Sequence, residues 1–208
     1  AVFEAARRAG VPRIVYASSS SVYGGGAEAP FREDAGADRP LSPYAATKRA
    51  NELQAAAHHH LHGTDVIGLR YFTAYGPRQR PEMAIHRFTR LIHEGRPVTV
   101  FGDGSARRDF TFIDDIVDGT VKALNGPGGC RLYNLGESRT TSVSRVVEMV
   151  ADALGRPTRI EYRPAEPGDV PLTCADVSRA RAELGYDPRV PLEDGIPRFV
   201  RWYLDQRP

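Results

Sequence analysis

The chain has 208 residues, of which 41% are hydrophobic and 26% charged, with a formal net charge of +2. This size suits one medium domain, or one domain with a small lobe. No apolar run approaches the roughly eighteen residues of a membrane span, and the basic residues are scattered, so the sequence argues against a membrane protein and against nucleic-acid binding.

The two cysteines indicate the cellular compartment of the protein, and the first ten residues indicate whether the chain is part of a longer one. Cys130 and Cys174 lie far apart and outside any CxxC spacing, so we expect neither a disulfide framework nor a zinc site. A reducing cytoplasm is the compartment that this predicts. Residues 1–10 lack the apolar stretch of a signal peptide and do not begin with Met, which indicates a piece of a longer protein.

The first elements in the chain alternate between helix and strand. Residues 1–10 have apolar side chains at helical spacing and end on glycine, which predicts a helix. Residues 13–18 form a short β-rich run without strict alternation, which is typical of a strand covered on both faces. Residues 19–41 are rich in Ser, Gly, Pro and Asp and predict a long loop that carries function. This order indicates a wound α/β sheet.

A second helix and a second buried strand follow this loop. Ser42 is a good N-cap and Pro43 a good first residue for a helix that runs to about His62. Residues 65–71 predict the next buried strand, and residues 73–81 predict a loop rich in Gly and Pro.

The second half of the chain contains shorter elements. We expect helices at about 83–93, 113–124, 143–154 and 192–205, and strands at 97–102, 108–113, 131–136 and 159–164. Because these elements are short and separated by many loops, they indicate a small lobe that packs beside the sheet.

Tyr44 and Lys48 are the residues that first suggest chemistry. They lie one turn apart on the same face of a helix, and an ammonium beside a phenol stabilises the phenolate, which can then act as a base. Residues 18–21 add four serine hydroxyls at the carboxyl end of a buried strand, where ligands bind in open α/β sheets. Oxidation of an alcohol to a ketone requires both kinds of group. Taken alone, the Tyr–Lys motif favours a solvated surface pair and the serine run favours a flexible loop, and only their combination favours chemistry.

An ordered set of motifs carries a family resemblance. The motifs are "SSSSVYG" at 18–24, "SPYAATK" at 42–48, "LRYFTAYGP" at 69–77 and "FGDGSARRDFTFIDDIV" at 101–117. Together they resemble the extended short-chain dehydrogenase/reductase family, specifically its nucleotide-sugar epimerases and dehydratases. The resemblance implies an α/β fold, the C-terminal part of a Rossmann-type parallel sheet with a small α/β substrate-binding lobe. It also implies NAD as cofactor and a UDP-sugar as substrate.

The resemblance also implies a domain organisation. Members of the family begin with a half that carries a GxxGxxG loop, and no segment of this sequence fills that role, so we expect the chain to match the carboxyl-terminal two thirds of such an enzyme. Residues 1–75 would be the remaining part of the NAD-binding domain. Residues 76–208 would mainly form the sugar-nucleotide-binding lobe, with short returns to the Rossmann domain at about 109–135. A homodimer through the helix at 1–10 and the YxxxK helix is expected.

The resemblance assigns roles to individual residues. Tyr44 would be the general base, Lys48 its partner and a ligand of the nicotinamide ribose, and Ser19 the hydroxyl that holds the reacting oxygen. The other residues expected beside the cofactor are Ser18, Tyr71 and Phe72, and those expected to line the sugar are Ser20 and Ser21.

Three further residues are expected to hold the nucleotide. Phe101 would stack on the uracil, and Arg108 would pair with the diphosphate because its planar donor fork suits phosphate oxygens. Asp169 would reach the ribose hydroxyls or order its loop. Glu166 stands where many relatives have an arginine, so diphosphate binding would depend more on Arg108.

The segment "FTAYGPRQRPEMA" at 72–84 is similar to the corresponding pattern of UDP-glucuronate 4-epimerases. In that group, residues at the positions of Thr73 and Arg80 face the carboxylate of the sugar, and Arg87 would add a second positive contact. Because the strand end has serines and no carboxylic acid, epimerisation is favoured over dehydration. The resemblance therefore implies conversion of UDP-glucuronate to UDP-galacturonate through a 4-keto intermediate.

Three alternatives stay open. The protein could be a UDP-glucose or UDP-galactose 4-epimerase, a dehydratase or decarboxylase, or a sugar-nucleotide-binding fragment that is inactive without the NAD-binding half. The histidines at 58–62 point around a helix and are expected to form a polar helix end and not a metal site. His86 and His93 are expected to be structural.

Overall fold

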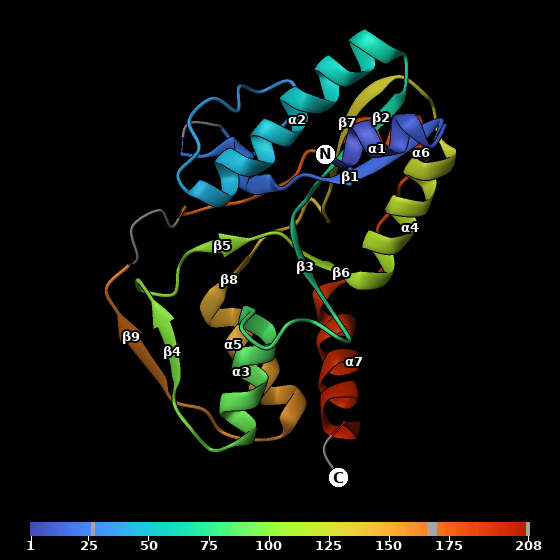
Figure 1. Ribbon diagram of the computed structural model, residues 1–208. Helices are drawn as coiled ribbons and strands as arrows, with labels where there is room; N and C mark the ends of the chain where they lie inside the picture. Colours follow the sequence, from blue (N-terminus) through green and yellow to red (C-terminus); the bar gives the residue numbers. More distant parts are fainter. Residues whose placement is uncertain (26–27, 166–169, 207–208) are drawn as a thin grey trace.

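The computed structural model describes residues 1–25, 28–165 and 170–206. Its largest sheet is parallel, with the strand order β1–β2–β7 (Figure 1). These strands are β1 (Arg13–Ala17), β2 (Asp65–Tyr71) and β7 (Cys130–Leu135). In the register of the sheet, Val15 pairs with Ile67, which pairs in turn with Arg131. The expected α/β class with a parallel sheet is confirmed.

Helices cover both faces of this sheet. They are α1 (Val2–Arg8), α2 (Pro43–His62), α4 (Ile113–Asn125) and α6 (Ser178–Leu184). Successive residues of a strand point to opposite faces, so Arg70 points toward α2 while the hydroxyl of Tyr71 bonds to Thr120 of α4. The predicted bounds of α2 are correct because the Ser42 hydroxyl accepts a hydrogen bond from the amide of Ala45 (3.1 Å), and Gly63 ends the helix in the left-handed region.

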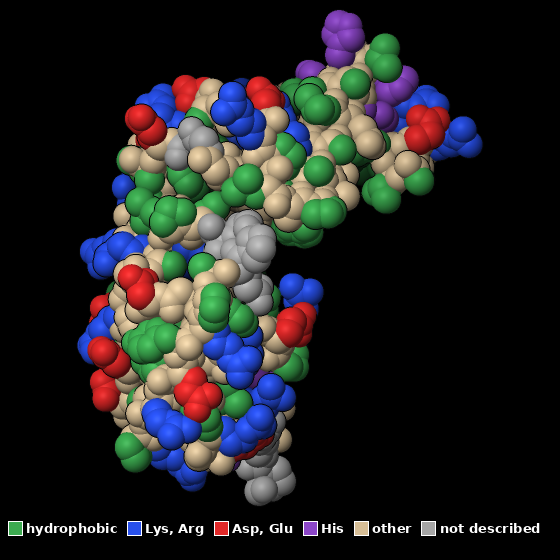
Figure 2. Space-filling view, turned by 90° about the vertical axis from the view of Figure 1, so that its left-hand side faces the viewer, with side chains coloured by type: hydrophobic (Ala, Val, Ile, Leu, Met, Phe, Trp, Pro, Cys, Tyr) green, Lys and Arg blue, Asp and Glu red, His purple; other side chains and the backbone are tan. Residues whose placement is uncertain are grey.

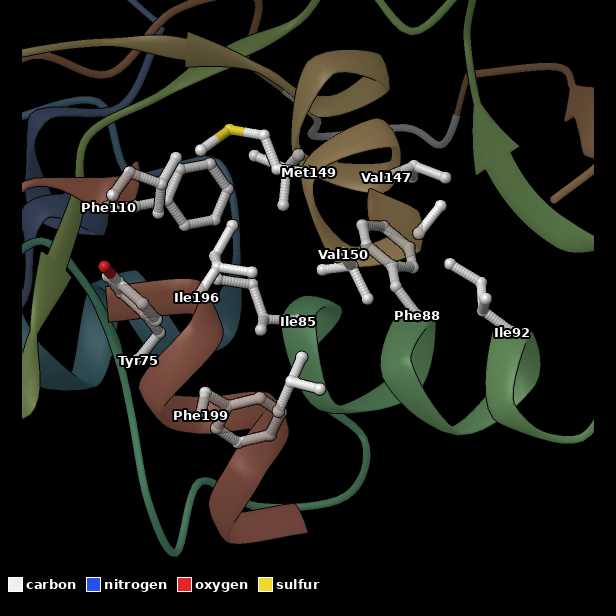
Figure 3. Close-up of a cluster of buried hydrophobic side chains, with 14 of the residues drawn as sticks. Tyr75, Ile85, Phe88, Ile92, Phe110, Val147, Met149, Val150, Ile196 and Phe199 are labelled. Atoms are coloured by element: carbon white, nitrogen blue, oxygen red, sulfur yellow. The ribbon is translucent and has the colours of Figure 1, made fainter. Parts of the chain in front are cut away.

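A second lobe lies below the sheet in Figure 1. It contains β4 (Val98–Phe101) paired with β9 (Ile160–Arg163), β5 (Arg107–Arg108) paired with β8 (Thr141–Ser142), and the helices α3 (Ala84–His93), α5 (Val143–Leu154) and α7 (Leu192–Asp205). Figure 3 shows the core of this lobe, where Phe88 of α3, Val150 of α5 and Phe199 of α7 point toward one another. A Cβ at Gly195 would collide with the Tyr75 hydroxyl, which explains this glycine inside α7.

The two lobes are joined by a short parallel pair of strands, β3 (Thr73–Tyr75) and β6 (Phe110–Phe112). The space-filling view shows a bend where the lobes meet, with histidines at the far end of the upper lobe (Figure 2). As expected, these histidines form the last turns of α2, where His58 stacks on Phe3 (5.6 Å between ring centroids). Among the described residues, no cluster of three His, Cys, Asp or Glu side chains could hold a metal ion. None of the described helices combines the length and apolar character needed to cross a bilayer.

Four local expectations differ from the structure. The loop at 19–41 contains a 3-10 helix, η1 (Ser20–Tyr23), and the loop at 73–81 begins with β3. The single strand expected at 108–113 is divided into β5 and β6. Helix α6 was not predicted, because its N-cap Val177 provides no side-chain cap and Ala180 is the one described residue of the helix that is buried. β3, β5 and β6 depend on strand partners that are distant in sequence, whereas Ser19 caps η1 locally.

A buried ion pair ties α2 to the sheet. The guanidinium of Arg70 donates two hydrogen bonds of 2.8 Å to the carboxylate of Glu52, and both side chains are at most 2% exposed. Ser18 and Arg49 also donate to this carboxylate, at 2.5 and 3.0 Å. Burial by itself raises the pKa of Glu52, but the hydrogen bonds from Arg70 and Ser18 outweigh burial and lower it. The carboxylate is therefore ionised and fully partnered in the folded state.

Replacement of Arg70 by Met should destabilise the protein by about 3–5 kcal/mol, because it leaves the Glu52 charge buried without its main partner. Arg145→Met is the matched control, since Arg145 pairs with Glu148 on the surface, where both side chains are more than half exposed. This control should cost about 0.5 kcal/mol. Urea denaturation measures both losses, and similar values for the two variants would contradict the expectation.

Candidate active site

Two adjoining cavities lie at the carboxyl ends of β1 and β2. The larger has a volume of about 800 Å³ and the smaller about 230 Å³, and Ser20, Ser21 and Thr73 line both. The two cavities form one crevice, which extends from Tyr44 in the larger to Arg108 in the smaller. This is the position that open α/β sheets use for ligands.

The first turns of α2 bring Tyr44 to the larger cavity and place Lys48 beside its ring. Tyr44 is 55% exposed, and the ammonium of Lys48 lies 5.7 Å from the centre of the Tyr44 ring. The same ammonium donates a 3.0 Å hydrogen bond to the carbonyl of Ala17, the last residue of β1. The positive charge is thus held between the phenol and the strand that leads to the serines.

All four serines of the segment line the larger cavity, and the hydroxyls of Ser18 and Ser19 also make structural hydrogen bonds. The Ser19 hydroxyl accepts from the amide of Ser21 and donates to its Oγ, both at 3.1 Å, so that it caps η1. The Ser18 hydroxyl donates a hydrogen bond to the buried carboxylate of Glu52 in α2. Ser20 and Ser21 line both cavities.

Aromatic side chains close the end of β2. Tyr71 and Phe72 both line the larger cavity. The hydroxyl of Tyr71 is bonded to Thr120 Oγ1 at 3.0 Å, and burial raises the pKa of Tyr71. Phe72 is 4% exposed and packs against the rings of Tyr23 and Phe31. These two rings therefore have fixed positions at the bottom of the cavity.

The predicted substrate residues fall into two groups. Thr73, Arg80 and Arg108 line the crevice, and the guanidinium of Arg80 is exposed and lies 3.3 Å from the Glu82 carboxylate. Arg87 and Phe101 lie together instead, with the guanidinium 5.9 Å from the ring centre, and line neither cavity. Two more residues, Asp169 and Glu166, lie outside the described residues.

Sequence reasoning missed several residues of the crevice. Gln79, Met83 and Ile113 also line the larger cavity, and Val170 and Thr173 line the smaller. Gln79, Met83 and Ile113 lie within the motifs at 72–84 and 101–117, but the motifs did not single them out, because the place of these residues depends on how distant loops pack. Glu52, in contrast, follows Lys48 by the same four residues that separate Lys48 from Tyr44, a spacing that could have indicated its place on that helix face.

A buried carboxylate stabilises the loops around Arg108. Asp109 is fully buried and accepts hydrogen bonds from the amides of Glu137 (2.8 Å), Ser138 (3.0 Å) and Ala175 (3.0 Å). These amides belong to the segment after β7 and to the segment before α6. The position of Arg108 beside the smaller cavity is therefore tied to both loops through the next residue in the chain.

Comparisons with known proteins agree with this geometry. The model of the NAD dependent epimerase/dehydratase family matches residues 1–136. A UDP-glucuronate 4-epimerase of Thermodesulfobacterium geofontis is 44% identical over 194 residues, which are 93% of this chain and 59% of that protein. The chain spans about three fifths of the length of the curated relatives it matches.

Solved structures give a similar result. UDP-glucuronic acid 4-epimerase from Bacillus cereus, in complex with UDP-glucuronic acid and NAD, has a TM-score of 0.93 and 36% identity, over 99% of this chain and 65% of that one. UDP-glucose 4-epimerase from Thermotoga maritima, with UDP-glucose, has a TM-score of 0.94 and 28% identity, over 99% of this chain and 67% of that one.

Glu137 should make stability depend on pH. Burial, and then the charge of Asp109, raise the pKa of Glu137 from 4.5 to about 7. The protonated Glu137 carboxyl group contributes its full share of the folding stability below pH 4.5, the pKa of glutamate in the unfolded chain. This contribution is lost as the pH rises to about 7, because the unfolded chain releases the carboxyl proton at a lower pH than the folded chain does. Glu137→Gln should therefore gain up to about 3 kcal/mol relative to the wild type over this interval. Urea denaturation across the interval tests this, with Glu148→Gln as the surface control, and parallel curves for wild type and Glu137→Gln would contradict it.

Proposed function

Because the chain belongs to the NAD-dependent epimerase/dehydratase family, we propose that it carries out epimerisation at C4 of a UDP-uronic acid, UDP-glucuronate to UDP-galacturonate. The observation that carries the proposal is the larger cavity, which Tyr44, Ser20, Thr73 and Arg80 line together. These residues come from separate segments of the chain, and only folding brings their chemistry into one space.

The residues of the larger cavity fit the nicotinamide end of NAD. The cavity is of the size that small-molecule sites have, it contains the rings of Tyr71 and Phe72 for a flat aromatic group, and Lys48 offers an ammonium for ribose hydroxyls. NAD, when bound, supplies the acceptor for the C4 hydride and its donor to the other face of the 4-keto sugar.

The side chains of this chain would perform the proton transfer and the positioning. The phenol oxygen of Tyr44 takes the proton of the C4 hydroxyl, and the ammonium of Lys48 stabilises the phenolate that does so. Hydroxyls of the segment from Ser19 to Ser21 hold the sugar oxygen. Arg108, at the other end of the crevice, pairs with the diphosphate, and Asp169 stays a proposed contact of the nucleotide ribose.

Arg80 would bind and protect the sugar carboxylate. A 4-keto uronic acid is a β-keto acid, which loses carbon dioxide readily. A guanidinium that holds the carboxylate in an orientation unsuited to that loss keeps the intermediate intact, and Thr73 adds a hydroxyl to the lining of the same cavity. Arg87 and Phe101 stay proposed contacts of the sugar nucleotide, although they line neither cavity.

Epimerisation of an uncharged UDP-sugar is the second candidate. The ion pair between Arg80 and Glu82 favours it, because a guanidinium that already has a carboxylate beside it is less available to a uronic acid. A dehydratase or decarboxylase would release water or carbon dioxide, which product analysis detects. A fragment that only binds sugar nucleotides would show heat of binding without turnover.

The organisation of the chain is also part of the proposal. Residues 1–75 would contribute to the NAD-binding domain and residues 76–208 mainly to the sugar-nucleotide lobe, with a return at about 109–135. The placement of β7 beside β2 supports the return. Val2, Leu53 and Leu61 are exposed apolar residues of α1 and α2, which supports a homodimer through these helices. Two free cysteines suit a cytoplasmic location.

Tyr44→Phe should lower turnover of UDP-glucuronate by about 10²–10⁴-fold and leave its binding nearly unchanged, because only the proton acceptor is lost. Tyr162→Phe is the matched control, since both tyrosines are 55% exposed. Product formation is followed by chromatography with added NAD, and binding by calorimetry. A wild-type chain that forms no product, or a Tyr44→Phe variant with full activity, would contradict the proposed mechanism.

Arg80→Ala should weaken the binding of UDP-glucuronate by about 10–100-fold, the value of a charged hydrogen bond, and leave the binding of UDP-glucose unchanged. Arg96→Ala is the control, because Arg96 is an exposed arginine paired with Glu94, two residues away, as Arg80 is with Glu82. Calorimetry with both ligands measures the effect. Equal losses for the two ligands would favour the uncharged sugar.

A further inference from the structure

The segment at 76–83, the arginine loop, places two guanidinium groups at the larger cavity. Arg78 and Arg80 both line this cavity and both are exposed. The Arg80 side chain contacts near neighbours in the chain, Glu82 at 3.3 Å and the sulfur of Met83 at 3.8 Å. Exposed contacts of this kind define an orientation weakly. The direction of these arginines must therefore come mainly from the backbone of the loop.

Gln79 connects the two ends of the arginine loop. Its Nε2 donates to the carbonyl of Ala74 in β3 at 3.0 Å, and its Oε1 accepts from the amide of His86 in the first turn of α3 at 3.1 Å. The N-cap of α3, Met83, provides no side-chain cap, so Gln79 satisfies one of the amides that a helix start leaves open. One side chain thus links the strand, the loop and the helix.

His86 holds the backbone of Gln79. Its Nδ1 donates to the carbonyl of Gln79 at 2.8 Å, which requires the proton to be on Nδ1. The ring is 9% exposed and lies against three rings of α7, those of Phe199, Trp202 and Tyr203, with centroids 5.5–6.0 Å away. The loop is therefore attached to the core of the lobe that Figure 3 shows around Phe199.

The backbone on either side of Gln79 is unusual. Arg78 has φ +68°, in the left-handed region that residues other than glycine rarely adopt. Such a conformation persists only where the surrounding contacts impose it. Gly76, at φ +139°, lies so close to Ile113 of α4 that a Cβ would collide with that side chain. The loop between these residues therefore has one well-defined path.

We propose that Gln79 and His86 are positioning residues that aim Arg80 at the substrate, and that they determine the preference for a sugar that carries a carboxylate. This inference rests on the proposed function. It gives a role at the site to His86, which the sequence predicts to be structural, and to Gln79, to which the sequence analysis assigns no role. Neither residue would contact the reacting atoms.

The test is the ratio of two affinities, measured by calorimetry on the whole chain. UDP-glucuronate and UDP-glucose share the nucleotide and differ at C6, so their ratio reports only the contact with the carboxylate. Gln79→Ala, and His86→Phe, which keeps an aromatic ring against α7, should each lower the ratio by about 5–20-fold with little change for UDP-glucose. Gln54→Ala, on the exposed side of α2, is the matched control and should not change the ratio.

The possible outcomes separate this inference from the proposed function. If the wild type prefers UDP-glucuronate and both folded variants keep that preference within twofold, the positioning role is wrong while the proposed function stands. Equal weakening of both ligands, or loss of the cooperative thermal transition in both variants, would make the contact a matter of stability and overturn the inference. A wild type that binds both ligands equally would contradict the proposed substrate, and the inference with it.

Discussion

The buried pair of Glu52 and Arg70 is the constraint on which the geometry of the crevice depends. Glu52 follows Lys48 by one helical turn, as Lys48 follows Tyr44, so one face of α2 carries both the candidate base and its anchor. Movement of α2 away from β2 would separate two buried charges, each of which costs several kcal/mol without a partner. Because Ser18 donates to the same carboxylate, the serine segment is attached to the same point. The distance between Tyr44 and the serines thus depends on Glu52, a buried residue that does not line the cavity.

Asp109 has a comparable role at the joint between the lobes. Its carboxylate accepts hydrogen bonds from backbone amides of two loops that are far apart in sequence. The backbone carbonyl of Asp109 accepts another hydrogen bond from the amide of Thr73, the first residue of β3. Neither Asp109 nor Glu52 lines the two cavities. Buried carboxylates therefore organise the site, while neutral hydroxyls and exposed arginines face its interior. None of the described residues that line the two cavities is an Asp or a Glu, which suits the binding of a negatively charged sugar nucleotide.

The sequence predicted best those features whose signals are local. Ser42, Pro43 and Gly63 each mark the same helix, so the bounds of α2 were correct, and Tyr44 lines the larger cavity with Lys48 one turn away beside its ring. Some short elements that need a distant partner were missed, as β3 shows, because its hydrogen bonds come from β6. The same reason explains Gln79, whose role exists only through His86 and Ala74. For Arg87 and Phe101, the motifs suggested contacts with the sugar nucleotide, and in the structure the two side chains pack against each other.

Selectivity for a charged sugar poses a particular problem in an open crevice. An exposed guanidinium is well hydrated, so its attraction to a carboxylate in water is small, and most of the gain is lost if binding must first order the side chain. A loop whose backbone is already held lowers that cost, because only the side chain remains to be immobilised. The left-handed backbone at Arg78 and the hydrogen bonds of Gln79 would then act before the ligand arrives. In such a site the discrimination between a carboxylate and a hydroxymethyl group depends less on the number of arginines than on how firmly the backbone beneath them is fixed.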